Sequence, residues 1–198
     1  PMIVNSDERQ WAWMDEGLTT FVQYLAEQEF GEKYPEIIAP LDKFPSDRGP
    51  AQLITDYMSV DQNFLAPIMS NPENVYYLGP NAYGKPAAAL NILRETIMGK
   101  ELFDYAFKTY SQRWMFKHPT PEDFFRSMED ASAVDLDWFW RGWFYTTDYV
   151  DIGLKEVNQY FVSPEPGEEM LKMMEEQGIP RNRRSEEHTS ELQSPVTI

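Results

Sequence analysis

Apolar residues return every three or four positions through much of this chain. Between Trp11 and Phe30 they form one continuous stripe, and shorter stripes with the same spacing follow further along. This period is typical of amphipathic helices that bury one face. The pattern predicts helices over residues 11–30, 51–57, 87–97, 103–114, 121–128 and 136–143.

Proline and glycine indicate where these helices begin and end. The prolines and glycines between positions 31 and 50 predict an irregular connection, because proline breaks a helix interior. Loop structure is expected again up to Pro86, which suits a first helical position, and Gly99 is expected to end that helix. Thr120 and Asp135 are expected to cap the two helices that follow them.

The last of these helices is apolar over most of its circumference, which predicts a place in the core. Trp138, Trp140 and Trp143 are all expected to contribute to that core. Beyond Thr147 the pattern weakens: alternation over 150–155 predicts a short strand, and a Met-rich amphipathic segment near 168–177 predicts a helix. The predicted fold class is therefore mainly α.

Composition and charge exclude several classes of partner. The 198 residues include 15% aromatic side chains, which supply enough apolar surface for a globular core. The net charge of −16 makes nucleic acid an unfavourable partner, and no apolar run is long enough for a transmembrane helix. The absence of Cys excludes disulfides and thiolate zinc ligands and leaves the compartment open.

The two ends of the sequence are unlike those of a complete natural protein, and each leads to an expectation. Because Pro1 opens inside an apolar segment, we expect an upstream portion of the parent protein. Residues 184–194 resemble a translated sequencing-library adapter; the alternative is a polar tail, and in either case His188 has no functional weight. The expected division is a helical lobe at 1–147, an extension at 148–183 and a non-native tail at 184–198.

Histidine chemistry within the chain is limited. Outside the adapter-like tail the sequence has one histidine, His118, which lies next to Pro119 between two predicted helices. One histidine cannot form a two-histidine metal site. His118 is interpreted as a solvated loop residue.

Glu16 is the candidate metal ligand. By periodicity alone it is a solvated carboxylate on the polar side of the first helix, shared with Thr20 and Gln23. The run Trp13-Met14-Asp15-Glu16-Gly17, however, resembles the Trp-x-x-Glu-Gly segment of the aminopeptidase N and leukotriene hydrolase type of zinc metallopeptidases, the gluzincins. The resemblance implies that Glu16 is the third zinc ligand. It places the other two, in a His-Glu-x-x-His helix, ahead of Pro1, because eighteen residues separate the second histidine from the Glu.

Tyr83 is the candidate catalytic residue. Tyr83-Gly84-Lys85 resembles the family's Tyr-x-Lys segment, whose tyrosine donates a hydrogen bond to the oxyanion of the tetrahedral intermediate. Gly84 and Pro86 depart from the commoner Tyr-Glu-Lys-Gly, and Tyr76 and Tyr77 are nearby alternatives.

Two neighbours of these residues have supporting roles by the same resemblance. Lys85 is expected to be structural or to support the site without contacting the substrate. Asp15 is expected either to orient a zinc-bound histidine or to act as an ordinary acid at a helix N-terminus.

The resemblance covers about residues 1–160 and implies the helical lobe of a thermolysin-like catalytic domain. By this resemblance the parent protein would be a zinc peptidase of the aminopeptidase type. It would act on peptides and pack against the missing N-terminal half of its catalytic domain. The alternatives are a zinc-free peptidase-like scaffold and a helical interaction protein. An exported or periplasmic location would suit a bacterial member.

Overall fold

The computed structural model describes residues 3–38, 50–150, 152–157 and 167–177. The chain divides into two compact units, Pro1–Val150 and Asp151–Ile198. The α-helices are α1 (Glu16–Lys33), α2 (Pro35–Ile38), α3 (Pro50–Met58), α4 (Lys85–Ile92), α5 (Lys100–Trp114), α6 (Pro121–Ser132), α7 (Asp137–Phe144) and α8 (Glu168–Glu176). Short 3-10 helices are η1 (Ala12–Met14), η2 (Gln62–Phe64) and η3 (Pro72–Asn74), and π-helical turns are η4 (Pro80–Gly84) and η5 (Leu93–Ile97).

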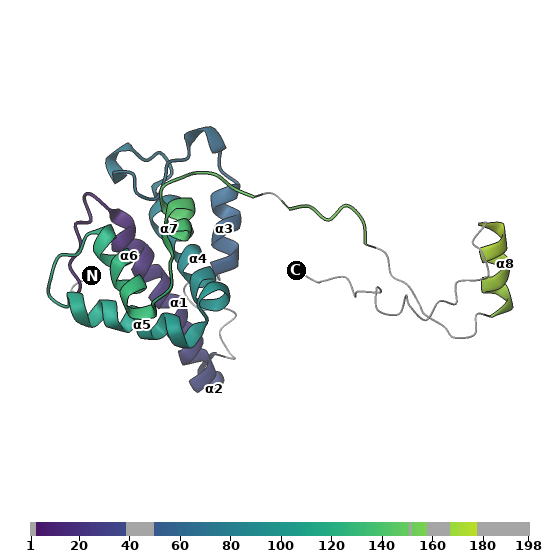
Figure 1. Ribbon diagram of the computed structural model, residues 1–198, viewed down its shortest axis with the longest axis horizontal. Coiled ribbons are helices and arrows are strands. Elements are labelled where there is room, and N and C mark those ends of the chain that lie inside the picture. Colours follow the sequence, from purple (N-terminus) through teal and green to yellow (C-terminus); the bar gives the residue numbers. More distant parts are fainter. Residues whose placement is uncertain (1–2, 39–49, 151, 158–166, 178–198) are drawn as a thin grey trace. The chain divides into compact units, whose positions relative to one another are not determined.

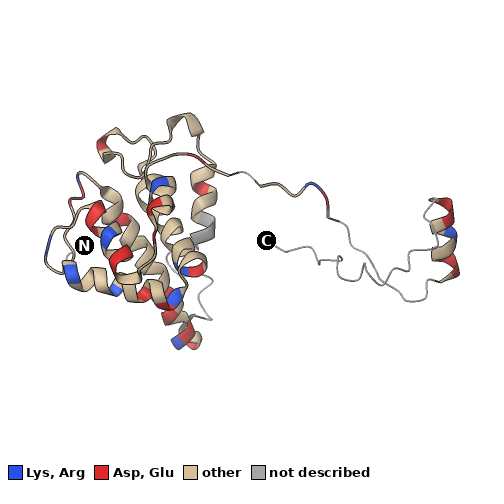
Figure 2. Ribbon diagram, viewed as in Figure 1, with Lys and Arg blue, Asp and Glu red and all other residues tan. Residues whose placement is uncertain are grey.

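The predicted fold class is confirmed: the described residues are mainly helical (Figure 1). In the first unit α1 packs against η4 and α4, α3 packs against the same two elements, and α5 packs against α6. Acidic and basic positions are interspersed over these helices (Figure 2). The helices predicted from periodicity at 11–30, 51–57, 103–114 and 121–128 correspond to α1, α3, α5 and α6.

Aromatic side chains form the centre of the first unit. Trp13, just before α1, stacks on Phe125 of α6 with ring centroids 5.9 Å apart, and Phe125 stacks on Trp140 of α7 at 4.6 Å. Phe124 meets Tyr110 of α5 edge to face at 4.8 Å. These contacts join four helical segments through one buried cluster, where each large ring removes apolar surface from water.

The start of α6 shows why its prediction succeeded. Thr120 accepts a hydrogen bond from the backbone N–H of Asp123, and the Asp123 carboxylate accepts one from the backbone N–H of Thr120. This capping box satisfies two backbone donors that the helix would otherwise leave unpaired, and Pro121 occupies the first position, where no N–H is needed. At α7 the Asp135 carboxylate accepts from the N–H of Asp137, the first residue of the helix, although the N-cap position is one residue later than expected, at Leu136.

The region around Pro86 differs from the prediction. A loop was expected up to Pro86, but the chain already coils from Pro80, and α4 begins at Lys85 with Pro86 in its second position. The backbone N–H of Lys85 donates to the carbonyl of Pro80, which is the wide spacing of a π-helical turn. Gly99 ends the region as expected, with a φ of 81° that favours glycine.

Two further expectations are wrong. Trp138 is 61% exposed, because its position on α7 faces away from the cluster that buries Trp140. The strand expected over 150–155 is absent from the residues described there, namely 150 and 152–155, and Val150, Ile152 and Leu154 are all exposed. Alternating apolar residues form a strand only where a neighbouring strand pairs with their backbone, and the part of the chain that the structure describes offers no such strand.

In the second unit, α8 confirms the helix predicted near 168–177. Within the described part of the chain, every helix is too short or too polar to cross a bilayer. His188 and the adapter-like residues lie outside the described residues, as does the connection between α2 and α3, residues 39–49. The predicted domain limits stay a prediction.

Candidate active site

Glu16 is the first residue of α1, where the chain leaves η1 and turns into the helix. Its side chain is half-buried. Gly17 beside it is buried against the helix that follows Tyr83: a Cβ atom at Gly17 would lie 2.6 Å from Pro86 Cγ and 3.0 Å from the Ala82 carbonyl oxygen. The absence of a side chain at Gly17 therefore lets α1 approach η4 and α4 closely enough to bring Glu16 next to Tyr83.

Tyr83 lies in the π-helical turn η4 and is 40% exposed. The residues two positions before and after it, Asn81 and Lys85, are both buried. The turn thus anchors polar side chains in the interior on either side of a tyrosine that points outward.

Tyr83 and Glu16 meet directly. The Tyr83 hydroxyl donates a hydrogen bond to the Glu16 carboxylate, and this bond is the main cause that raises the pKa of Tyr83 to about 12. Partial burial and the negative charges of Glu16, Glu8 and Asp15 act in the same direction. The phenol is therefore a protonated hydrogen-bond donor throughout the neutral pH range.

Both side chains line one pocket of about 390 Å³. Its wall is formed by Glu8, Arg9, Ala12, Glu16, Pro72, Glu73, Leu78, Ala82 and Tyr83. Charged and polar side chains occur in this wall together with apolar ones, the mixed lining expected of a binding site for a polar ligand. The alternatives Tyr76 and Tyr77 are not part of this wall; Tyr76 is 73% exposed and packs on Phe64 and Tyr77.

Lys85 points away from the pocket into the protein. Its Nζ atom donates to the Tyr57 hydroxyl at 3.2 Å and to the Thr146 carbonyl at 3.0 Å, and lies 4.8 Å from the centre of the Tyr57 ring. Desolvation lowers the pKa of Lys85 from 10.5 to about 8, although the charge of Asp148 opposes that shift. Asp15 is the N-cap residue of α1, is buried, and makes no capping hydrogen bond with its side chain.

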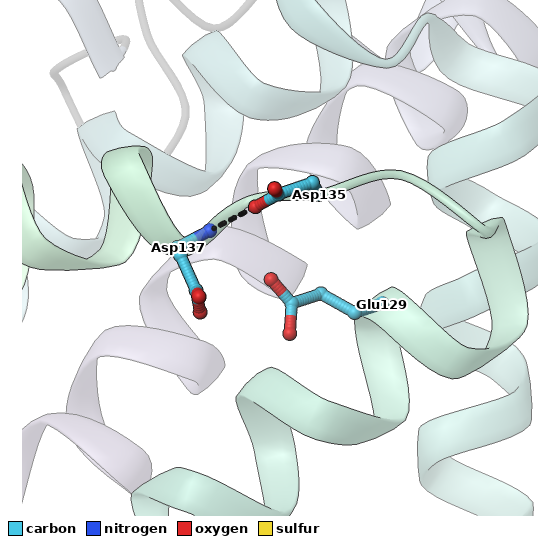
Figure 3. A group of neighbouring side chains, drawn as sticks. All are labelled: Glu129, Asp135 and Asp137. Carbon is cyan, nitrogen blue, oxygen red and sulfur yellow. Dashed lines mark hydrogen bonds between the residues drawn. The ribbon is translucent and has the colours of Figure 1, made fainter.

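A second group of carboxylates lies between α6 and α7 (Figure 3). Oxygen atoms of Glu129, Asp135 and Asp137 approach within 4.8 Å of one another. Backbone bonds account for two of them: Glu129 accepts from Leu136 N–H at 2.8 Å, and Asp135 accepts from Asp137 N–H at 3.1 Å. These groups shape the turn into α7 and are not part of the Glu16 and Tyr83 pocket.

Sequence reasoning missed several residues that line the pocket or lie beside it. Asn81 lies between Pro80 and Gly84, and these two residues indicate a loop. The available signal was the Asn itself, because Asn in a turn often forms a hydrogen bond from its side chain to the backbone. Glu8, Arg9 and Glu73 gave no signal, because exposed charged residues are common in any chain. His118 is exposed as interpreted, with Nδ1 2.9 Å from the Asn5 carbonyl oxygen.

Comparison with known proteins identifies the family. Residues 3–143 match the model of the Peptidase family M1 domain, a range that contains α1, η4 and the whole pocket lining. Neither curated proteins nor solved structures gave a match. The match covers most of the described first unit and confirms the family resemblance drawn from the sequence. The chain therefore belongs to the M1 family of peptidases, metallopeptidases that generally depend on zinc.

Proposed function

We propose that the parent protein is a zinc-dependent aminopeptidase to which this chain contributes one metal ligand, Glu16, and one hydrogen-bond donor to the substrate, Tyr83. The observation that carries this proposal is the hydrogen bond between the two side chains inside a shared pocket. Removal of an amino-terminal residue, as opposed to internal cleavage, rests on the family resemblance alone.

The residues of the pocket fit part of a catalytic zinc site. Carboxylate oxygen is an accepted zinc ligand, and catalytic sites of this kind use three protein ligands. Glu16 is the carboxylate that the Tyr83 phenol reaches, and the pocket wall of this chain contains neither histidine nor cysteine. The two remaining ligands would come from the His-Glu-x-x-His helix that the resemblance places ahead of Pro1. Zinc, when bound, supplies a Lewis acid that activates water for attack on the peptide bond.

Tyr83 would act on the carbonyl oxygen of the scissile bond. As attack proceeds this oxygen gains negative charge, and a donor placed beside it lowers the barrier by about 3 kcal/mol. The hydroxyl is suited to the task because its raised pKa keeps it protonated, while its exposure allows a substrate oxygen to take the place of the Glu16 carboxylate as acceptor. Peptide binding in the pocket is the substrate interaction that this role requires.

Two substitutions in the full-length enzyme test the assignment. Glu16→Ala should remove a ligand and most zinc affinity, whereas Tyr83→Phe should retain zinc and the fold but lower kcat by about 100 to 1000-fold. Tyr76→Phe is the matched control, because it removes a phenol outside the pocket, and should leave kcat unchanged. Zinc content by mass spectrometry and steady-state kinetics give the readout.

Normal kcat in Tyr83→Phe would reject Tyr83, and full zinc content in Glu16→Ala would reject Glu16. A parent sequence without His-Glu-x-x-His would favour the zinc-free scaffold instead. The 198-residue chain itself should hydrolyse no peptide and bind zinc weakly at most, since one carboxylate cannot hold the ion tightly. Calorimetric titration that revealed a submicromolar site would show that the ligands have been assigned wrongly.

A further inference from the structure

We infer that Asn81 and Lys85 are positioning residues for Tyr83: two buried polar side chains that hold the π-helical turn η4 so that the phenol faces Glu16. The inference rests on the proposed role of Tyr83 and adds two residues that do not themselves contact the pocket.

Lys85 closes the turn with its backbone and anchors it with its side chain. Its N–H donates to the Pro80 carbonyl, so the wide turn that contains Tyr83 ends at this residue. Its side chain is 4% exposed, and the ammonium group bonds to Tyr57 of α3 and to the Thr146 carbonyl beyond α7. One lysine thus joins three segments that are distant in the sequence.

Asn81 anchors the other end of the same turn. Its side chain is 3% exposed, and its Nδ2 atom donates to the carbonyl oxygens of Ala66 at 2.8 Å and Pro67 at 3.2 Å. Its backbone N–H donates to the Tyr77 carbonyl at 3.1 Å. The loop before η3 is therefore tied to the turn two residues ahead of Tyr83.

The position of these anchors explains why polar residues are used. A π-helical turn is rare and is less favourable than an α-helical turn, so it persists where surrounding contacts hold it. Burying a charged ammonium group is costly unless it is hydrogen-bonded, and here the bonds go to two partners on other elements. An apolar residue of similar length would fill the space without fixing the rotation of the turn. Loss of either anchor should displace the phenol while zinc binding by Glu16 stays intact.

A double-mutant cycle in the full-length zinc enzyme tests this. We expect Lys85→Met to lower kcat by about 10 to 100-fold with zinc content and KM unchanged, because small displacements of a catalytic group cost up to about 100-fold. In the Tyr83→Phe background the same substitution should change kcat by less than about 2-fold, because the group that it positions is already absent. Lys108→Met removes an exposed lysine of α5 and is the matched control.

Equal losses from Lys85→Met in both backgrounds would overturn the inference, since they would indicate a general structural role. So would normal kcat in Lys85→Met. If that variant does not fold, the cycle with Asn81→Ala decides by the same criterion. Normal kcat in Tyr83→Phe alone would instead reject the proposed function, and the inference with it.

Discussion

The two sides of the first unit are held together by different kinds of contact. The side built from α5, α6 and α7 packs through aromatic rings, and its helices are ordinary α-helices with a well-formed cap at Thr120. The side built from α1, α3, η4 and α4 also contributes apolar residues to the core, such as Phe21 and Leu90. It differs by its glycine contact, its π-helical turn and the buried polar groups of Asn81 and Lys85. We call the first the aromatic side and the second the polar side. Packing of rings on the aromatic side stabilises the fold, whereas the buried polar groups of the polar side fix the direction of the Tyr83 phenol.

The largest effect on stability is expected from the aromatic side. Phe124 is fully buried and contacts the rings of Trp13, Tyr110 and Trp140. Phe124→Ala should lower the free energy of unfolding by about 3–5 kcal/mol, through lost burial and the cavity left behind. Urea unfolding of the chain measures it. Phe64→Ala, at an exposed ring, should cost far less; equal costs would contradict the comparison.

A smaller effect is expected where α1 meets Pro86. Gly17→Ala should destabilise by about 2–3 kcal/mol, because the added Cβ atom would overlap the Pro86 ring and approach the Ala82 carbonyl. Gly142 offers a matched control in α7: a Cβ atom there meets nothing within 4 Å, so Gly142→Ala should stabilise by up to about 1 kcal/mol. Thermal unfolding of both variants would distinguish close packing from helix propensity, and a neutral Gly17→Ala would refute the contact.

Burial of Lys85 predicts a pH dependence of stability on the polar side. Burial lowers the pKa of Lys85 from 10.5 to about 8. Between these two pH values the unfolded chain binds a proton at Lys85 that the folded chain lacks. The free energy of unfolding therefore rises with pH across this range. Relative to Lys85→Met, the unsubstituted chain should gain about 2 kcal/mol between about pH 7 and 9.5.

Denaturant unfolding at several pH values provides the measurement for Lys85. The raised pKa of Tyr83 acts in the opposite direction above about pH 10, where unfolded phenols ionise first, so the comparison stops below that value. Parallel pH profiles for the two chains would show that Lys85 keeps its ordinary pKa.

The smallest effect is expected at Trp138. Although it lies in the helix that carries Trp140, it is exposed and contacts only the edge of Phe139 among the ring pairs of the described residues. Trp138→Ala should cost about 1 kcal/mol or less, against about 3–5 kcal/mol for Trp140→Ala. Similar unfolding midpoints for the two variants would mean that Trp138 is buried after all.

Periodicity and caps predicted the aromatic side well because its signals are local. The capping box at Thr120 and the spacing of Phe103, Phe107 and Tyr110 each define a helix without reference to the rest of the chain. The same signals failed for Trp138, since an all-round apolar helix does not reveal which side meets the core. They failed for 150–155 because a strand depends on a partner elsewhere.

The polar side was less accessible to sequence reasoning. Glu16 and Tyr83 came from family resemblance, and the structure places them in one pocket, while their roles stay predictions. The π-helical turn around Tyr83 could not be predicted from local sequence, because Pro80 and Gly84 indicate a loop. The contacts that hold the turn come from residues distant in the sequence, namely Gly17, Ala66 and Tyr57.

The π-helical turn also constrains how this chain can change in length. It holds one more residue than an α-helical turn would, just ahead of α4. Deleting a single residue there, such as Gly84, would rotate Tyr83 by about 100° relative to α4, the angle between successive residues of a helix. Substitutions at exposed positions of α4 leave the direction of the Tyr83 phenol unaltered. An insertion or deletion of one residue between Tyr83 and α4 changes it. Among related sequences, the number of residues between Tyr83 and Ile92 should therefore vary less than the residues themselves.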